Sequence, residues 1–176
     1  MSKVGGFTLI EVLVVVGISV ILVSTSLPTF IDTIERYQIR TQADRFLSII
    51  KLARVTAIEH VKKVRVCPST NQSTCDTSGG FNWSNGFIVL VDANDNATYS
   101  QVSQVIDGFD GNSTITLKDG SAATISSLTF RPLGILEGVT SASFEFRMPD
   151  CIGPTNRDIS IAFNGSASIS TLECPE

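Results

Sequence analysis

The longest apolar segment of the chain lies at its start. Residues 7–27 form a run of 21 in which Glu11 is the only ionisable side chain. At about 1.5 Å per residue, a helix of this length spans a bilayer core of roughly 30 Å. Ionisable side chains inside such segments are costly and are usually functional. The pattern therefore predicts a membrane-spanning helix in which Glu11 requires a partner.

The pattern becomes amphipathic beyond Pro28, a residue that removes a backbone donor and predicts a kink or loosening at residues 24–28. Apolar residues then recur at intervals of three and four, as on one face of a helix that we expect to end near His60. They are Phe30, Ile34, Tyr37, Ile39, Ala43, Phe46, Ile50, Ala53 and Ala57. One alternative is that this stripe forms a coiled coil with another helix. The strand-like sequence that follows directly favours instead a head domain that folds onto the stripe.

From Val61 onward the pattern changes to short runs rich in β-branched and aromatic residues, separated by Gly, Asn, Asp and Pro clusters. The predicted strands are residues 61–66, 86–91, 98–106, 114–118, 123–130, 142–148, 157–163 and 166–172. Asn164-Gly165 is a strong hairpin signal, and alternation places Ile159, Ile161 and Phe163 on one face. The predicted fold class is α+β: a long N-terminal α-helix, membrane-spanning and then amphipathic, packed on an antiparallel β-rich globular head.

Charge divides the chain in the same way. Residues 1–66 hold nine Lys/Arg and five Asp/Glu, a net charge of +4, whereas residues 67–176 hold four and twelve, a net charge of −8. An acidic head argues against nonspecific attraction to phosphate backbones. Lys3 and the absence of acids at the start predict a cytoplasmic leader, residues 1–6. The helix, residues 7–60, then leads to a periplasmic or extracellular head, residues 61–176.

Four cysteines lie in the head: Cys67, Cys75, Cys151 and Cys174. An even number outside the cytoplasm suggests disulfides, although four cysteines formally allow three pairings. Local pairing is the simplest solution. It joins Cys67 to Cys75 across a polar loop, and Cys151 to Cys174, which ties the last hairpin to the strand before it. The longer of these two loops contributes about 3 kcal/mol in the chain-entropy model.

The string Gly6-Phe7-Thr8-Leu9-Ile10-Glu11, with the apolar run behind it, resembles the class III signal of type IV pilins and of type II secretion pseudopilins. The resemblance implies that a prepilin peptidase cleaves between Gly6 and Phe7 and methylates the new amino terminus of Phe7. It also implies that Glu11 pairs with the amino terminus of a neighbouring subunit during filament assembly. Such a pair in low dielectric loses far more than an exposed pair when one partner is removed. The alternative is an unprocessed anchor.

The head carries a second, moderately specific resemblance. Val66-Cys67-Pro68, Cys75 and the run of residues 83–92 are similar to the FimU/FimT/GspH-like family of type IV minor pilins. This implies the type IV pilin fold and a FimU-like role: priming pilus assembly, a place at or near the pilus tip, and support of twitching motility, adhesion or DNA uptake. A GspH-like minor pseudopilin of type II secretion is the alternative.

The implied partners are other minor and major pilins, the prepilin peptidase, the inner membrane and its assembly platform. The chain is expected to cross the inner membrane once, with its head in the periplasm, and then to enter a pilus at the cell surface. A FimT-like DNA receptor is a lesser alternative, because the place of the family's Gly-Arg-x-Arg motif reads Gly165-Ser166-Ala167-Ser168. Both arginines that would clamp phosphates are missing, so DNA is not an expected partner.

Other chemistry finds little support. Residues 92–96 have the oxygen density of a calcium loop, but Ala97 and Ser103 stand where an EF-hand loop needs Gly and Glu, so we predict a turn. His60 is the only histidine, and there is no Cys-x-x-Cys. A transition-metal site is therefore not predicted. With no nucleotide loop or nucleophile elbow either, we predict no enzyme activity, catalytic residue, metal or cofactor.

Overall fold

The computed structural model describes residues 6–76, 83–108, 114–148 and 155–174, with only the backbone described for residues 25–32 and 35. The chain divides into two compact units, Met1–Gln38 and Ile39–Glu176, and the boundary falls inside one helix. Cys151 lies outside the described residues.

The helix α1 extends over Leu9–His60 and ends at the predicted residue. Its backbone continues through Pro28, so the loosening predicted at residues 24–28 does not interrupt it. At its end, Lys62 N–H donates to Ala57 O at 3.2 Å and Val61 N–H donates to Ile58 O at 3.3 Å. This is the bonding of a Schellman cap, and Val61 takes the left-handed position with φ 53°. The predicted strand 61–66 therefore begins only after the cap.

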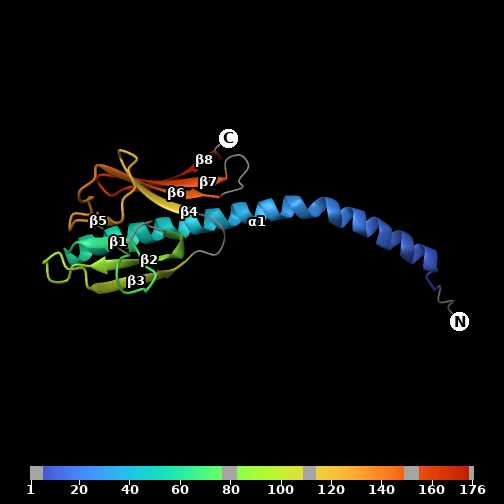
Figure 1. Cartoon of the computed structure of the whole chain (residues 1–176), viewed down its shortest axis with the longest axis horizontal. Helices are drawn as coiled ribbons and strands as arrows, with labels where there is room; N and C mark the ends of the chain where they lie inside the picture. The colour runs from blue at the N-terminus through green and yellow to red at the C-terminus, as the bar shows by residue number, and fades with distance from the viewer. Residues whose placement is uncertain (1–5, 77–82, 109–113, 149–154, 175–176) are drawn as a thin grey trace. The chain divides into compact units, whose positions relative to one another are not determined.

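Within the described residues, eight strands follow in two four-stranded antiparallel sheets (Figure 1). Sheet A has the order β3-β2-β1-β5 and sheet B the order β4-β6-β7-β8. Their bounds are β1 Val64–Pro68, β2 Gly86–Val91, β3 Gln101–Asp107, β4 Thr114–Asp119, β5 Leu128–Phe130, β6 Ser141–Arg147, β7 Asn156–Ala162 and β8 Ala167–Leu172. A short 3-10 helix, η1 Trp83–Asn85, precedes β2 and was not predicted.

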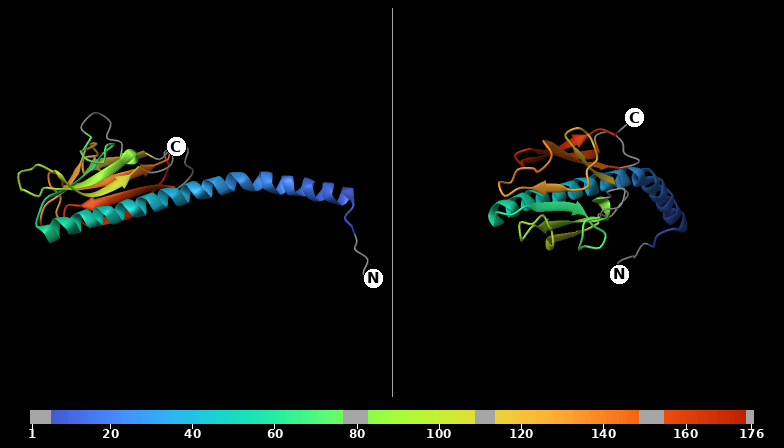
Figure 2. Two further views of the ribbon diagram at one scale, coloured as in Figure 1. Left: turned by 90° about the horizontal axis from the view of Figure 1, so that it is seen from below. Right: turned by 60° about the vertical axis from the view of Figure 1, so that its left-hand side comes forward.

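The second half of α1 lies against both sheets, as the two views of Figure 2 show. All six stripe residues from Ile39 to Ala57 are buried in the main core cluster. Phe46 lies at its centre, with ring centroids 4.6 Å from Phe87 of sheet A and 4.4 Å from Phe144 of sheet B. The predicted fold, a long helix packed on an antiparallel β-rich head, is confirmed.

The stripe prediction was wrong for Ile34 and Tyr37. Both belong to the first unit, and their exposed fractions are 42% and 70%. No described strand belongs to that unit. The spacing of Ile34 and Tyr37 places them on one helix face, but no described sheet of their own unit covers that face. The side chain of Phe30 lies outside the description.

The last hairpin forms where it was predicted, but its turn has a different geometry. Ala162 N–H donates to Ser166 O at 3.0 Å, and Gly165 N–H donates to Ala162 O at 2.8 Å. Gly165 has φ 77° and Asn164 is not in the left-handed region, which is a three-residue loop with a bulge at the glycine. Phe163 therefore belongs to the turn and is 51% exposed, whereas Ile159 and Ile161 are buried as predicted.

Two predicted strands were too long. The predicted strand 98–106 begins at Gln101, and the predicted strand 123–130 is reduced to β5. Residues 123–125 instead fold back along β4, where Ile125 N–H donates to Leu117 O at 3.1 Å. Residues 123–125 therefore pair with the edge of β4 and do not form part of β5.

Candidate assembly site

The N-terminal end of α1 is closed by a capping box. Thr8 precedes the first helical residue, and its Oγ1 accepts a hydrogen bond from Glu11 N–H at 3.3 Å. In return Glu11 Oε2 accepts from Thr8 N–H at 3.5 Å. This Thr-x-x-Glu arrangement satisfies two of the helix's orphan donors reciprocally. The 3.5 Å bond is at the upper limit for a hydrogen bond, so it is weak and leaves the carboxylate most of its bonding capacity.

Thr8 is a site residue that sequence reasoning missed. The signal was present, because a Ser or Thr three residues before Glu and directly before an apolar run is the sequence signature of a capping box. The prediction for Glu11 used only its charge in an apolar segment and left out its role in capping the helix. The carboxylate thus has a local structural function besides any intermolecular one.

The apolar residues that follow are exposed on every side. Described side chains from Leu9 to Ser24 are all exposed, and Phe7 is 84% exposed. A helix that is apolar all round calls for an apolar surrounding, in a membrane or in a protein. By a hydropathy criterion, the described part of the chain contains no helix that is apolar over the length of a bilayer crossing.

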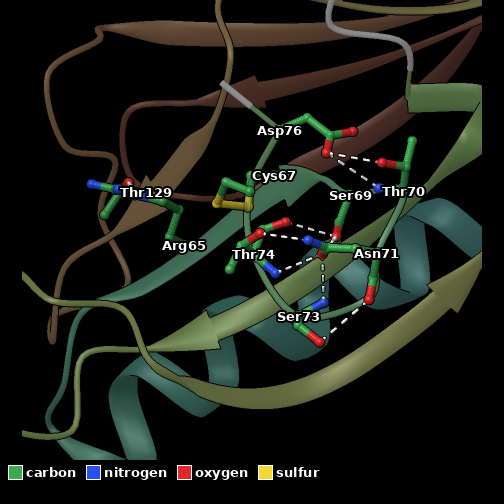
Figure 3. The surroundings of a disulfide bond; sticks show 10 residues. Arg65, Cys67, Ser69, Thr70, Asn71, Ser73, Thr74, Asp76 and Thr129 are labelled. Atoms are coloured by element: carbon green, nitrogen blue, oxygen red, sulfur yellow. Dashed lines mark hydrogen bonds between the residues drawn. A yellow bond between two sulfur atoms is a disulfide. The ribbon is translucent and has the colours of Figure 1, made fainter. Parts of the chain in front are cut away.

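In the head, a disulfide joins Cys67 at the end of β1 to Cys75, with a Cα–Cα distance of 5.5 Å (Figure 3). This is the local pairing that the sequence favoured. Cys67 belongs to a small second cluster with Ile88 and Leu90, which lies apart from the main core. The disulfide therefore packs against apolar residues of sheet A.

Hydrogen bonds within the disulfide loop hold its shape. Asn71 Oδ1 accepts from the N–H groups of Ser73 and Thr74, both at 2.9 Å, as in an Asx-turn (Figure 3). Thr70 donates through its N–H and its hydroxyl to Asp76 Oδ1. Outside the loop, Gln72 Nε2 donates to Asp107 Oδ1 at the end of β3 at 2.9 Å. The loop is a polar surface that its own hydrogen bonds and the bond to Asp107 hold against sheet A.

Only one cysteine of the second predicted disulfide lies among the described residues. Cys174 is disulfide-bonded. Its predicted partner, Cys151, is not among the described residues, so the pairing of Cys151 with Cys174 stays a prediction.

The remaining candidates serve structural roles. Asp92 is 1% exposed, and its two carboxylate oxygens accept from Asn96 N–H at 3.2 Å and Ala97 N–H at 2.9 Å. These bonds make the acidic loop a turn, as predicted. Within the described ranges, no group of three or more His, Cys, Asp or Glu is arranged to hold a metal ion. Residues 165–168, where a DNA-binding motif was considered, form the turn before β8 and its first two residues.

Two ionic groups stabilise the sheets. Glu145 on sheet B accepts hydrogen bonds from Lys118 Nζ at 2.8 Å and Arg147 Nε at 2.9 Å. Burial acts to raise the pKa of Glu145, but the two hydrogen bonds and their charges outweigh it and hold that pKa below 4.5. Lys63, just before β1, donates a hydrogen bond to Glu137 in the segment after β5. This bond raises the pKa of Lys63.

Two family models match the sequence. Residues 42–165 match the model described as type II transport protein GspH, and residues 1–27 match that of the prokaryotic N-terminal methylation motif. No curated protein matches the chain.

Among solved structures, the fold is similar to that of the type IV minor pilin FimU of Pseudomonas aeruginosa, with a TM-score of 0.58 at 21% identity. The alignment covers 77% of this chain and 90% of that one. The minor pseudopilin EpsH of the Vibrio cholerae type II secretion system gives a TM-score of 0.52 at 12% identity, over 80% of this chain and 97% of the other. At these identities the likeness shows the fold. Because the first family model covers more than half of the sequence, the chain belongs to the family described as type II transport protein GspH, and its first 27 residues carry the prokaryotic N-terminal methylation motif.

Proposed function

We propose that this chain is a FimU-like minor pilin that helps to prime pilus assembly and lies at or near the pilus tip. Residues 7–27 insert in the inner membrane as a single span, with the head in the periplasm. A prepilin peptidase cleaves between Gly6 and Phe7 and methylates the amino terminus of Phe7. The chain then joins other pilins in a filament that serves twitching, adhesion or DNA uptake.

The observation that carries this proposal is the state of the Glu11 carboxylate. It is exposed, it lies in the first turn of α1, and among the described residues it accepts one hydrogen bond, at 3.5 Å from Thr8 N–H. Apolar side chains surround it in sequence, where an unpaired charge is costly. A methylated ammonium on Phe7 of a neighbouring subunit supplies the opposite charge, so the ion pair forms only on assembly.

Substitution of Glu11 by Gln and by Ala separates charge from capping. Glutamine also accepts a hydrogen bond at this position of a capping box, so Glu11→Gln keeps the helix cap but loses the charge. We expect both variants to be cleaved and methylated, measured by mass spectrometry of Phe7, and both to be absent from sheared filaments. If Glu11→Gln enters filaments like the wild type and Glu11→Ala does not, capping is the function of Glu11 and the pairing proposal fails.

Cleavage is tested separately. Gly6→Ala places a Cβ where the structure has no heavy atom within 4 Å, so the fold should be unaffected. We expect this variant to accumulate as the precursor in the membrane fraction, seen as a mass larger by the six-residue leader. Normal processing of Gly6→Ala would contradict the proposed cleavage site.

A GspH-like pseudopilin is the second candidate, and the match of residues 42–165 to the GspH model favours it. A deletion strain distinguishes the two systems. Loss of surface pili with intact protein secretion supports the minor pilin, and the reverse phenotype supports the pseudopilin. Complementation with the wild-type gene is the control.

A further inference from the structure

In the described part of the head, the two sheets have four edges, formed by β3 and β5 in sheet A and by β4 and β8 in sheet B. An edge strand presents unpaired N–H and C=O groups that can pair with another chain. Proteins usually cover such an edge or break it with charges, prolines or bulges. The four edges of this head differ in how they are protected.

Two edges are covered by the chain itself. Along β4, residues 123–125 fold back, with Asp119 N–H donating to Ala123 O at 2.9 Å. Along β5, Glu137 N–H donates to Thr129 O at 2.9 Å, and Lys63 Nζ holds Glu137 in place. A third edge, β3, is irregular: its register against β2 shifts between Val89 and Leu90, which leaves Ser103 as an extra residue.

The edge of β8 has none of these protections within the described residues. Its six residues pair with β7 in an unbroken register, from Asn156↔Leu172 to Ile161↔Ala167. None of them is charged or a proline. A regular, uncharged edge of this length is a template for strand addition.

The hairpin turn fixes which backbone groups of β8 face outward. Ala162 and Ser166 share a hydrogen bond, and bonded pairs alternate with unbonded pairs along an antiparallel ladder. The unbonded pairs with β7 are therefore those of Ala167, Ile169 and Thr171. Their N–H and C=O groups point away from β7, toward the open edge.

We propose that this edge of β8 is a docking site for a strand of a neighbouring pilin subunit, which adds to sheet B in antiparallel register. The inference rests on the proposed function, because it requires that the chain assembles with other pilins. Three outward pairs of backbone groups, on Ala167, Ile169 and Thr171, supply the hydrogen bonds. The added strand continues the core layer that β8 now leaves half covered.

The direction of β8 argues against a second copy as the partner. The turn before β8 touches Arg54 of α1, as the crowding of Gly165 shows, and Phe46 lies beside Phe146 at the far end of β6. From its turn, β8 therefore runs antiparallel to α1. Chains anchored alike in one membrane have α1 in the same direction, so an antiparallel partner strand must run along α1. The edges of this chain that do so, β4 and β5, are the covered ones.

Side chains define what the incoming strand should carry. On the core side, Ala167 and Ile169 are half-buried and pack against the main cluster. On the other side, Ser168 and Ser170 are exposed. The fitting strand is therefore uncharged, with apolar side chains toward the core and small polar ones outward. We assign it to a different pilin whose corresponding edge is open.

Proline substitution tests the edge without breaking the sheet. Thr171→Pro removes an N–H that faces outward and leaves the ladder with β7 intact, whereas Ser170→Pro removes one that bonds to β7. Thr171→Ala keeps the outward N–H and is the matched control. Thr171→Lys, which places a charge on the edge but keeps the backbone, is a second blocking variant if the proline perturbs the fold.

The measurement is photo-crosslinking in cells that produce the full-length chain, with a benzoylphenylalanine at Ser168. We expect a crosslink to another pilin of the same system, with the site mapped by mass spectrometry to an extended segment. It should fall by about tenfold in Thr171→Pro and Thr171→Lys and persist in Thr171→Ala. An unchanged crosslink in both blocking variants overturns the proposal, and so does a crosslink to a second copy or none at all.

Processing of Phe7 and incorporation into filaments are read from the same cells. A wild-type chain that is not processed contradicts the proposed function. A chain that is processed and assembled equally well with and without Thr171→Pro contradicts only the docking of β8.

Discussion

The two halves of α1 both carry many apolar side chains, but these have different surroundings. From Leu9 to Ser24 every described side chain is exposed, whereas from Ile39 to Ala57 one stripe is fully buried and the opposite face carries Arg40, Asp44 and Lys51. The second half is a component of the head's core. The first half has no such core within its own unit, and its described apolar side chains stay exposed.

The largest expected effect comes from emptying the centre of the buried stripe. Phe46→Ala should lower the free energy of unfolding of the head by about 3–5 kcal/mol, because it removes a ring in contact with aromatic residues of both sheets. Trp83, the only tryptophan, is buried with its ring centroid 6.1 Å from Phe46 and reports unfolding by fluorescence in denaturant.

Val14→Ala is the matched control for Phe46→Ala, applied to the full chain in detergent. Val14 is 54% exposed, so truncating it should leave the unfolding midpoint of the head unchanged. An equal loss in the two variants would show that the halves do not differ in the way described.

Substitution of a small residue by a larger one should also affect the two halves of α1 differently. Ala53 is fully buried between α1 and the sheets, so Ala53→Leu should cost about 1–3 kcal/mol through overpacking. A Cβ at Gly17 meets no heavy atom within 4 Å, and Gly17→Leu should leave the head's denaturation curve where it is. A head that tolerates Ala53→Leu without loss would contradict the tight packing of the stripe.

Much of this contrast could be predicted from the sequence. Intervals of three and four predicted the buried positions from Ile39 onward, and alternation predicted the buried face of Ile159 and Ile161 in β7, because both patterns follow from local backbone geometry. Periodicity also included Ile34 and Tyr37, which are exposed, because a stripe shows which residues share a face and not whether anything covers that face. Phe163 failed for a related reason, since a three-residue turn ended the strand one residue early.

Other features depended on contacts between distant segments and had no local signal. The return of residues 123–125 along β4 and of residues 135–137 along β5 could not be read from composition. At the candidate assembly site, the roles of Phe7 and Glu11 stay predictions, and the capping signal of Thr8 in the sequence was missed. The open edge of β8 has no local signal either, because it differs from the other three edges only through contacts that those edges make.

A smaller effect is expected from the outer charges of sheet B. The pKa of Glu145 is lower in the folded chain than its ordinary value of 4.5, so its contribution is fully present above that pH and is lost as the pH falls through the folded pKa. Glu145→Gln should therefore destabilise the head at neutral pH and flatten the decline of its stability below pH 4.5. Unfolding midpoints of the two proteins between neutral and acid pH check this. Parallel curves would show that Glu145 does not contribute.

The smallest expected effect lies where the buried half ends. Val61 holds a left-handed conformation, φ 53°, which costs a residue with a Cβ about 1–2 kcal/mol, and it is exposed, so it gains little packing in return. Val61→Gly removes that strain but adds about 0.4–1 kcal/mol of chain entropy to the unfolded state. The net gain should be about 0.5 kcal/mol, a rise of roughly 2 °C in the Tm of the head. Val61→Ala, which keeps a Cβ, should raise the Tm by less than Val61→Gly. A fall in Tm with glycine would mean that the Val61 side chain stabilises the end of α1 through contacts.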